Sequence, residues 1–292
     1  TTGTQNVAVG ANALDAATEA NNNVGVGYAS LSAVTTGSQN TGVGGFSASV
    51  ITTGADNVAL GYHTLNACTS GGKNVAIGRN ALDSNTTASE NTAVGYNSAT
   101  ANTTGTANVA LGKAALFSNT TASNNTAIGY HSLLSNITGA GNTAVGKVAL
   151  DANTTGNSNV AVGNQSLGEN TTASQNVAVG DHALNKNTTA SNNTAIGYAA
   201  LFTNTTGFNE TAIGSYALYS NTTGEANTAV GAFTLDANTT GDFNTALGQG
   251  ALTVATTADN NTAVGRAALH LTTTGANNTA VGKDALNANT TG

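Results

Sequence analysis

Aliphatic, small and polar residues recur along this chain with a period of 17 residues. With few substitutions, the pattern Asn-(Thr/Val)-Ala-(Val/Ile/Leu)-Gly returns seventeen times without one insertion. A repeat this short and regular is typical of a solenoid, in which each repeat forms one coil and stacked coils share a core. We number positions within a coil from its Asn, and the coils start at residues 6, 23, 40, 57, 74, 91, 108, 125, 142, 159, 176, 193, 210, 227, 244, 261 and 278.

The alternation of residue types predicts strands. Position 2 is always Val or Thr, and position 4 is always Val, Ile or Leu. Because strand side chains alternate between two faces, these positions share a face, and we expect it to point into the coil. Position 9 is Leu in fifteen coils. We predict one strand at positions 1–4, a turn at 5–7, a second strand from 8 to about 14 and a turn at 15–17. The expected fold is all-β, a parallel β-solenoid.

Two invariant or nearly invariant positions indicate turns. Position 5 is Gly in every coil, which predicts a positive φ or a close approach between neighbouring coils. Position 1 is Asn in every coil except at Glu210. Such a row predicts a ladder of side chains that satisfies the polar groups of the turn backbone.

Position 3 is small in every coil, with Ala in fifteen coils and Gly in two. If positions 2 and 4 point inward, position 3 points outward, where a side chain is free to vary. Its small size then indicates that another backbone packs tightly against it, and a second copy of the chain is the simplest candidate. We therefore expect an obligate homo-oligomer whose interface includes Ala59, Ala76, Ala93, Ala110, Ala127, Ala144, Ala161 and Ala178.

A second Asn column starts at position 12, where the tripeptide Asn-Thr-Thr or Asn-Ile-Thr matches the acceptor sequence for N-glycosylation. The alternative is an Asn and Thr ladder at a turn, and the presence of Val34, Ile51 and Cys68 at this position favours partial burial. The candidate glycosylation sites are Asn85, Asn102, Asn119, Asn136, Asn153, Asn170, Asn187, Asn204, Asn221 and Asn238.

Length and charge limit the partners. The repeat fills residues 1–292 as a single array, and both ends fall at the same phase of the repeat, so we expect a window of a longer chain. A net charge of −7 argues against a nucleic-acid partner. The sequence has no apolar run near 18 residues, so we expect no membrane insertion within this segment. We interpret the single cysteine, Cys68, as a small apolar residue that fills space in the core.

Candidate chemistry is sparse. His63, His131 and His182 share position 7 but lie in coils that are not neighbours, and His270 is at position 10, so we expect no metal site. We find no nucleophile with a matching base and no phosphate-binding loop, and we expect no cofactor and no enzymatic activity. Columns of Thr on a flat solenoid face can order water, so ice binding is a lesser alternative function. Tyrosines at position 6 of every second coil indicate either a contact stripe for a surface or glycan or an old duplication; they are Tyr28, Tyr62, Tyr96 and Tyr130.

The runs Asn-Val-Ala-Leu-Gly at 57–61, Asn-Val-Ala-Ile-Gly at 74–78 and Asn-Val-Ala-Val-Gly at 176–180 resemble the head repeat of YadA-like trimeric autotransporter adhesins. Similar repeats occur in tail fibres of phages and other viruses. The resemblance implies a left-handed parallel β-roll in which three chains pack around one axis, although the adhesin repeat is shorter. It implies a structural or adhesive segment of an extracellular fibre with a host-surface or matrix ligand, at a cell surface or, alternatively, in the shaft of a virion tail fibre.

Overall fold

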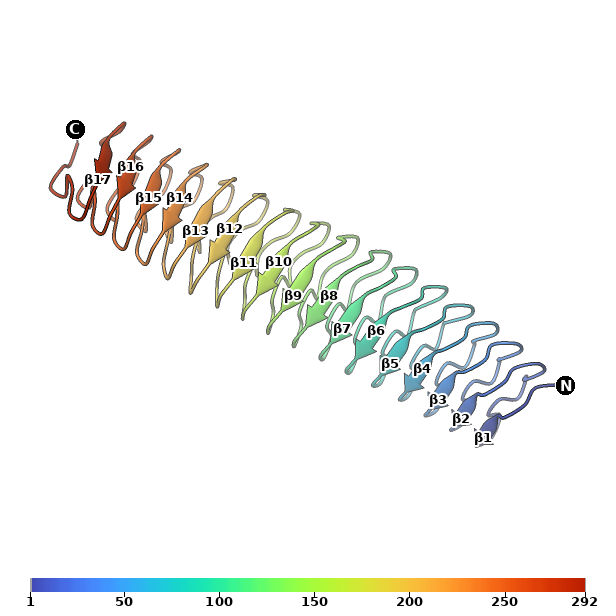
Figure 1. The fold of residues 1–292 in the computed structure, drawn as a ribbon. Helices are drawn as coiled ribbons and strands as arrows, with labels where there is room; N and C mark the ends of the chain where they lie inside the picture. Colours follow the sequence, from blue (N-terminus) through green and yellow to red (C-terminus); the bar gives the residue numbers. More distant parts are fainter. Residues whose placement is uncertain (1, 292) are drawn as a thin grey trace. The chain divides into compact units, whose positions relative to one another are not determined.

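The computed structural model describes residues 2–291, which contain seventeen strands and no helix. The chain forms two units, Thr1–Asn142 and Thr143–Gly292, and each is a β-solenoid with one strand per coil (Figure 1). The first unit holds β1 (Val7–Val9), β2 (Val24–Val26), β3 (Thr41–Val43), β4 (Val58–Leu60), β5 (Val75–Ile77), β6 (Thr92–Val94), β7 (Val109–Leu111) and β8 (Thr126–Ile128). The second holds β9 (Thr143–Val145), β10 (Val160–Val162), β11 (Val177–Val179), β12 (Thr194–Ile196), β13 (Thr211–Ile213), β14 (Thr228–Val230), β15 (Thr245–Leu247), β16 (Thr262–Val264) and β17 (Thr279–Val281).

Every strand occupies positions 2–4 of its coil and pairs in parallel with the strand of the next coil in its unit. In the pairing of β9 with β10, Thr143 lies opposite Val160 and Ala144 lies opposite Ala161, so partners are one repeat apart. The prediction of a parallel β-solenoid built from 17-residue coils is confirmed. The continuity of one array across residues 1–292 stays a prediction.

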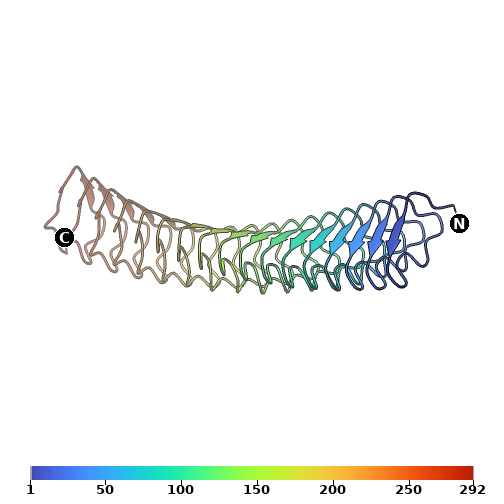
Figure 2. The same cartoon turned by 90° about the horizontal axis from the view of Figure 1, so that it is seen from below.

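The remainder of each coil contains no second strand, and the prediction of one at positions 8–14 was wrong. Figure 2 shows the strands β1–β5 on one side of their coils and the turns behind them. His131 and Leu133 have φ angles of 55° and 52°, in the left-handed region, which is incompatible with a pleated strand. The backbone still bonds between coils, since Leu116 N donates to Ser132 O over 3.0 Å. Coils therefore stack on this side through turns.

Position 5 has both properties that its invariant glycine indicates. Gly146 has a φ of 142°, and a Cβ placed on it would lie 2.4 Å from the carbonyl oxygen of Gly163 in the next coil. Neither the conformation nor the space admits a side chain. This glycine turns the chain out of the strand while the neighbouring coils remain in close contact.

The core of most coils is built from Ala at position 3 and Leu at position 9. Ala144 and Leu150 are both fully buried within the single chain. A Cβ placed on Gly42, which takes the position of this Ala, would lie 3.0 Å from Leu31 Cγ of the preceding coil. Position 3 therefore points inward and touches the leucine column directly.

The oligomer interface predicted at position 3 was consequently wrong. The interior is narrow, the leucine of the opposite wall fills most of it, and only Ala or Gly fits between. Volume rather than hydrophobicity decides which strand face points inward, and the larger side chains of positions 2 and 4 point outward. The eight alanines proposed for the interface are each 0% exposed in one chain: Ala59, Ala76, Ala93, Ala110, Ala127, Ala144, Ala161 and Ala178.

Candidate interaction surface

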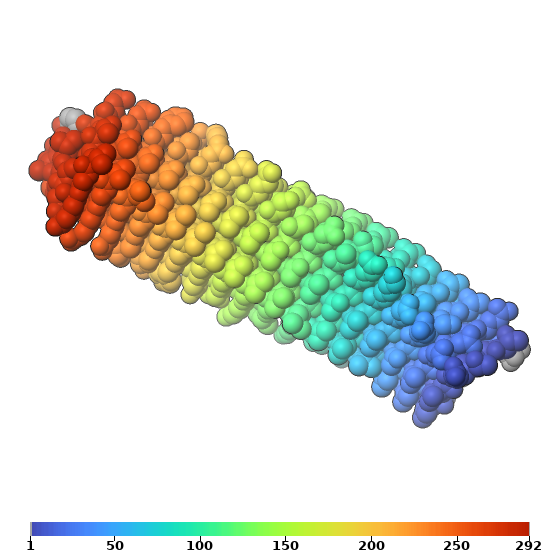
Figure 3. Space-filling view, viewed as in Figure 1, coloured from blue at the N-terminus to red at the C-terminus, as the bar shows by residue number. Residues whose placement is uncertain are grey.

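The outward face of the strands is uncharged in both units, with an aliphatic residue at position 4 and Val or Thr at position 2. We call positions 2 and 4 of all coils the strand face. Its side chains are mostly half-buried by their neighbours, but Leu111 remains 45% exposed and Leu247 46% exposed. No coil carries a charged residue at positions 2–5. Figure 3 shows how side chains of successive coils align in rows across the surface of each unit. An uncharged surface of this kind is unusual for a protein that stays monomeric in water.

Basic residues lie directly beside the strand face. Of the seven Lys and Arg residues, five occupy position 6, immediately after the glycine that ends the strand: Arg79, Lys113, Lys147, Arg266 and Lys283. An apolar centre bordered by charged side chains is the usual composition of a protein interface with its rim.

Position 2 changes along the chain from mainly Val to only Thr. The six strands β12–β17 each begin with Thr, in register with one another: Thr194, Thr211, Thr228, Thr245, Thr262 and Thr279. In these coils the strand face consists of a hydroxyl-bearing column beside an aliphatic column. This alternative composition is relevant to the second candidate function below.

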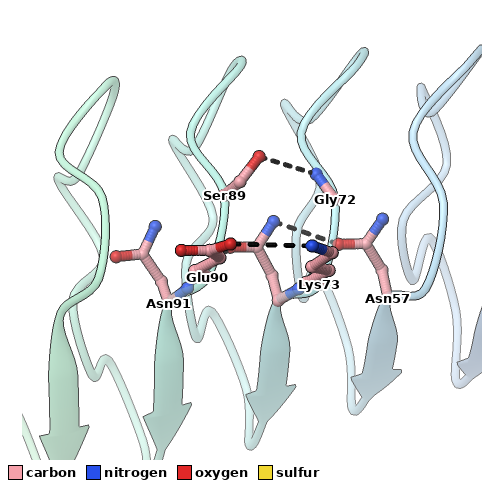
Figure 4. Close-up of polar contacts among 7 residues, drawn as sticks. Asn57, Gly72, Lys73, Ser89, Glu90 and Asn91 are labelled. Carbon is pink, nitrogen blue, oxygen red and sulfur yellow. Dashed lines mark hydrogen bonds and ion pairs between the residues drawn. The ribbon is translucent and has the colours of Figure 1, made fainter.

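The asparagine column at position 1 forms the expected ladder. Asn74 donates three hydrogen bonds. Its backbone N and its Nδ2 each donate to Asn57 Oδ1 of the preceding coil over 3.0 Å, and its Nδ2 also donates to Ala88 O over 2.9 Å. Figure 4 shows the amides of Asn57 and Asn91 in line on coils that are two repeats apart, with the Lys73–Glu90 ion pair nearby at 3.7 Å. The ladder is structural, and it bonds each coil to the one before it.

The asparagines proposed as glycosylation sites form a second buried ladder, so that hypothesis was wrong. Asn102 Nδ2 donates to Asn85 Oδ1 over 3.1 Å and to Gly105 O over 2.9 Å. Nδ2 is the atom that a glycan would occupy, and it lies in the core. The same burial, 0% exposure, applies to Asn85, Asn102, Asn119, Asn136, Asn153, Asn170, Asn187, Asn204, Asn221 and Asn238. Cys68 takes this position in its coil and is likewise buried.

Glu210 stands in the first ladder where the other coils have Asn. Its Oε1 accepts from Asn227 Nδ2 at 3.0 Å, and its backbone N donates to Asn193 Oδ1 over 2.8 Å. Burial raises the pKa of this carboxyl to about 8, with a smaller contribution from the negative charges of Asp242 and Glu225. The group therefore holds its proton at neutral pH, which lets it replace an uncharged amide.

The histidines do not come together. His63 and His131 pack against the neighbouring tyrosines Tyr62 and Tyr130, with ring centroids 4.2 Å and 3.8 Å apart. Among residues 2–291 no group of three or more His, Cys, Asp or Glu side chains is placed to hold a metal ion. The described part of the chain also has no helix long and apolar enough to cross a membrane.

An aromatic cluster on the second unit was missed by the repeat analysis. Tyr198, Phe202, Tyr216, Tyr219 and Phe233 form one chain of ring contacts with centroid distances of 5.3–5.4 Å. The available signal was density, because seven of the thirteen Phe and Tyr residues fall between residues 198 and 243.

No protein-family model matches this chain, and no curated protein matches it in sequence. The interpretation of its function therefore depends on the strand face, the ladders and the aromatic cluster.

Proposed function

We propose that this chain is a non-enzymatic segment of an extracellular structural or adhesive fibre, and that it assembles as a homo-oligomer through its strand face. The observation that carries the proposal is the uncharged strand face repeated in every coil, with Val, Ile or Leu at position 4 and Val or Thr at position 2. Exposing such a surface to water is unfavourable, and covering it with the same surface of another copy removes the cost. The homo-oligomer expected from the sequence is kept, but its interface moves from position 3 to positions 2 and 4.

The resemblance to YadA-like adhesins supports three chains around one axis, left-handed coils and a place at the cell surface. A virion tail-fibre shaft is the alternative setting. Both settings use a long, regular body that projects from a particle or a cell, and a solenoid supplies one because each coil repeats the contacts of the last.

The test is the oligomeric state measured by light scattering after size-exclusion chromatography. The double variant Val162→Asp with Val179→Asp places two charges on the strand face of neighbouring coils, and we expect it to dissociate the assembly. The matched control, Thr172→Asp with Thr189→Asp, places the same charges at exposed position 14 of the same coils. A wild-type chain that is a folded monomer would refute the proposal.

An adhesive segment and a spacer differ in one measurement. If variants shortened by whole coils attach to the host surface or matrix as well as the full segment does, the segment serves only as a spacer. If attachment is lost when particular coils are removed, those coils hold a ligand site.

Ice binding is a second candidate, favoured by the in-register Thr column of β12–β17 beside an aliphatic column. Regularly spaced hydroxyl and methyl groups on a flat parallel sheet can order water. This function needs an uncovered strand face, so it predicts a monomer with measurable thermal hysteresis. The absence of hysteresis in the isolated chain would remove it.

A further inference from the structure

Two adjoining hollows lie on the second unit beside the aromatic cluster. The first, which we call the polar hollow, measures about 340 Å³ and is lined by Gln165, Gly168, Glu169, Asn185 and Lys186. The second, the aromatic hollow, measures about 220 Å³ and is lined by tyrosines of the cluster. His182 and Phe202 line both. The two hollows therefore meet at these side chains and together form one extended groove.

One of the residues that line the polar hollow is a glycine. Gly168 is the only glycine at position 10 in the seventeen coils. Its neighbours in this column are Asp151 before it and Asn185 and Phe202 after it. A Cβ placed on Gly168 would lie 2.7 Å from Asn185 Nδ2, so the Asn185 amide occupies the space that a side chain at 168 would take. Asn185 Nδ2 also donates to Gln165 O over 2.7 Å, which fixes the amide beside Gly168 in the lining of the hollow.

The aromatic hollow is lined by rings, and two of them are parallel. The rings of Phe202 and Tyr219 stack with centroids 5.4 Å apart and an angle of 8° between their planes. Tyr198 and Phe233, which both contact Tyr216, remain 50% and 46% exposed. The core of these coils is already filled by Ala and Leu, so the rings add nothing to it. Their exposed faces form a surface on which another flat apolar face can pack.

Charged side chains of both signs line the polar hollow, namely Lys186, Glu169 and Asp151. Lys186 forms an ion pair with Glu169, and His182 Nδ1 lies 2.6 Å from Asp181 Oδ1. The groove thus offers carboxylate, amide and ammonium groups as hydrogen-bond donors and acceptors, with no excess of positive charge to attract an anion.

We propose that the groove binds an uncharged oligosaccharide, with one sugar residue in each hollow. A pyranose ring presents C–H groups on its faces and hydroxyls around its edge. The faces match the stacked rings of the aromatic hollow, and the hydroxyls match the side chains of the polar hollow. This inference rests on the proposed function, because it supplies the adhesive segment with the class of its ligand.

The first unit provides a natural comparison. Tyr28, Phe46 and Tyr62 also form a chain of ring contacts, with centroid distances of 5.2 Å and 6.1 Å. Position 10 of the coils that carry Phe46 and Tyr62 is filled by Ser49 and Asn66 rather than glycine. Aromatic rings are therefore present in both units, while the combination of rings with a polar hollow that includes Gly168 belongs to the second.

The experiment measures retention of the full chain on an array of neutral and sialylated oligosaccharides of two to six sugar residues, followed by calorimetric titration of the retained sugar. Phe202→Ala removes the ring shared by both hollows. Gly168→Asn introduces a residue that other coils carry at this position, as at Asn66 and Asn185, and its side chain displaces the Asn185 amide from its place in the polar hollow. Tyr62→Ala is the matched control, and the thermal denaturation of each variant verifies its fold.

We expect retention of a neutral oligosaccharide, at least a tenfold loss of affinity in both groove variants and no change in the control. The proposal is overturned if no neutral sugar is retained, if only sialylated sugars are retained, or if either folded groove variant binds like the wild type. Light scattering on the same samples reports the oligomeric state. An assembled chain without sugar binding refutes the groove alone, whereas a sugar-binding monomer refutes the proposed fibre and leaves the groove standing.

Discussion

Residues at positions 7 and 9 of almost every coil have a positive φ, in the left-handed region. This conformation is unfavourable for any residue with a Cβ. Position 9 is usually Leu, whose burial in the core offsets the strain. Position 7 lies nearer the surface and holds Asn, Ala, His, Gln and other unbranched residues. Val148 is the one β-branched residue at position 7, and it has a φ of 47°. A β-branched side chain is the least favourable type in this conformation.

Val148→Asn should therefore stabilise the second unit by about 1 kcal/mol, since Asn tolerates the left-handed region. The measurement is thermal or urea denaturation followed by circular dichroism. Gln165→Asn, at the same position of the next coil, starts from an unbranched residue and should change stability much less. A Val148→Asn variant no more stable than Gln165→Asn would contradict the assignment of strain.

Glu210 gives the second unit a pH dependence whose direction follows from burial. Its pKa rises from 4.5 in the unfolded chain to about 8 in the fold. Between these values the unfolded state releases the proton while the folded state keeps it, so stability falls as pH rises through this window. Above pH 8 the loss is complete, and at about 1.4 kcal/mol per pKa unit it reaches roughly 5 kcal/mol.

Glu210→Asn restores the ladder residue of the other coils and Glu210→Gln keeps the length without the charge. Both should leave stability little changed near pH 4.5 and raise it increasingly towards pH 8, by an amount on the order of 3–5 kcal/mol. Denaturation at pH 5, 7 and 9 measures the difference. A gain of equal size at all three values would show that the carboxyl does not titrate in this range.

At the scale of the element, the buried Asn ladders replace the hydrogen bonds that a second strand would provide. Asn221 Nδ2 donates to Asn204 Oδ1 and to Gly224 O, each over 3.0 Å, and Asn221 Oδ1 accepts from Asn238 Nδ2 at 2.9 Å. One side chain thus bonds three coils. Removing it leaves buried polar groups without partners, which costs more than the bonds themselves contribute.

We expect Asn221→Ala to destabilise the second unit by roughly 2–4 kcal/mol. Cys68→Ala is the matched change at the end of the column, where the only side-chain contact along the ladder is the 3.7 Å approach of Asn85 Nδ2 to the sulfur. It should cost about 1 kcal/mol or less. Chemical denaturation of both variants tests the difference, and equal losses would mean that the ladder contributes no more than simple packing.

The repeat made the stacking of coils predictable. It did not predict which face of each strand points into the coil. The invariant glycine column of Gly146 correctly predicted a turn, and the asparagine column of Asn142 correctly predicted a ladder, because both depend on local backbone chemistry. The orientation of Ala144 and Val145 depends on the width of the coil, which is set by Leu150 on the opposite wall. Alternation of residue types defines two strand faces but does not show which one points inward. Hydrophobicity favoured the face of positions 2 and 4, whereas the face of position 3 is the one in the core. The groove could not be predicted either, since it depends on which coils neighbour Gly168.

At the scale of the whole molecule, each coil contacts only its neighbours, so stability is expected to be close to a sum over coils. Every coil presents the same interface: in the second unit, Thr228 pairs with Thr245 and Thr245 with Thr262, in identical register. A missing coil therefore leaves two surfaces that fit each other, whereas a missing fraction of a coil does not.

Deletion of residues 244–260 removes one complete coil and places Asn261 where Asn244 was, with Asn227 Oδ1 as the acceptor for its backbone N. We expect a folded chain whose circular dichroism per residue is unchanged and whose melting temperature falls by a few degrees at most. Deletion of residues 244–252 is the control, because it removes about half a coil, moves every later Asn, Gly and Leu out of its column and buries polar groups without partners. It should unfold the coils that follow. If both deletions melt alike, the contacts that hold the coils together do not depend on register, and the ladders described above are not what specifies the fold.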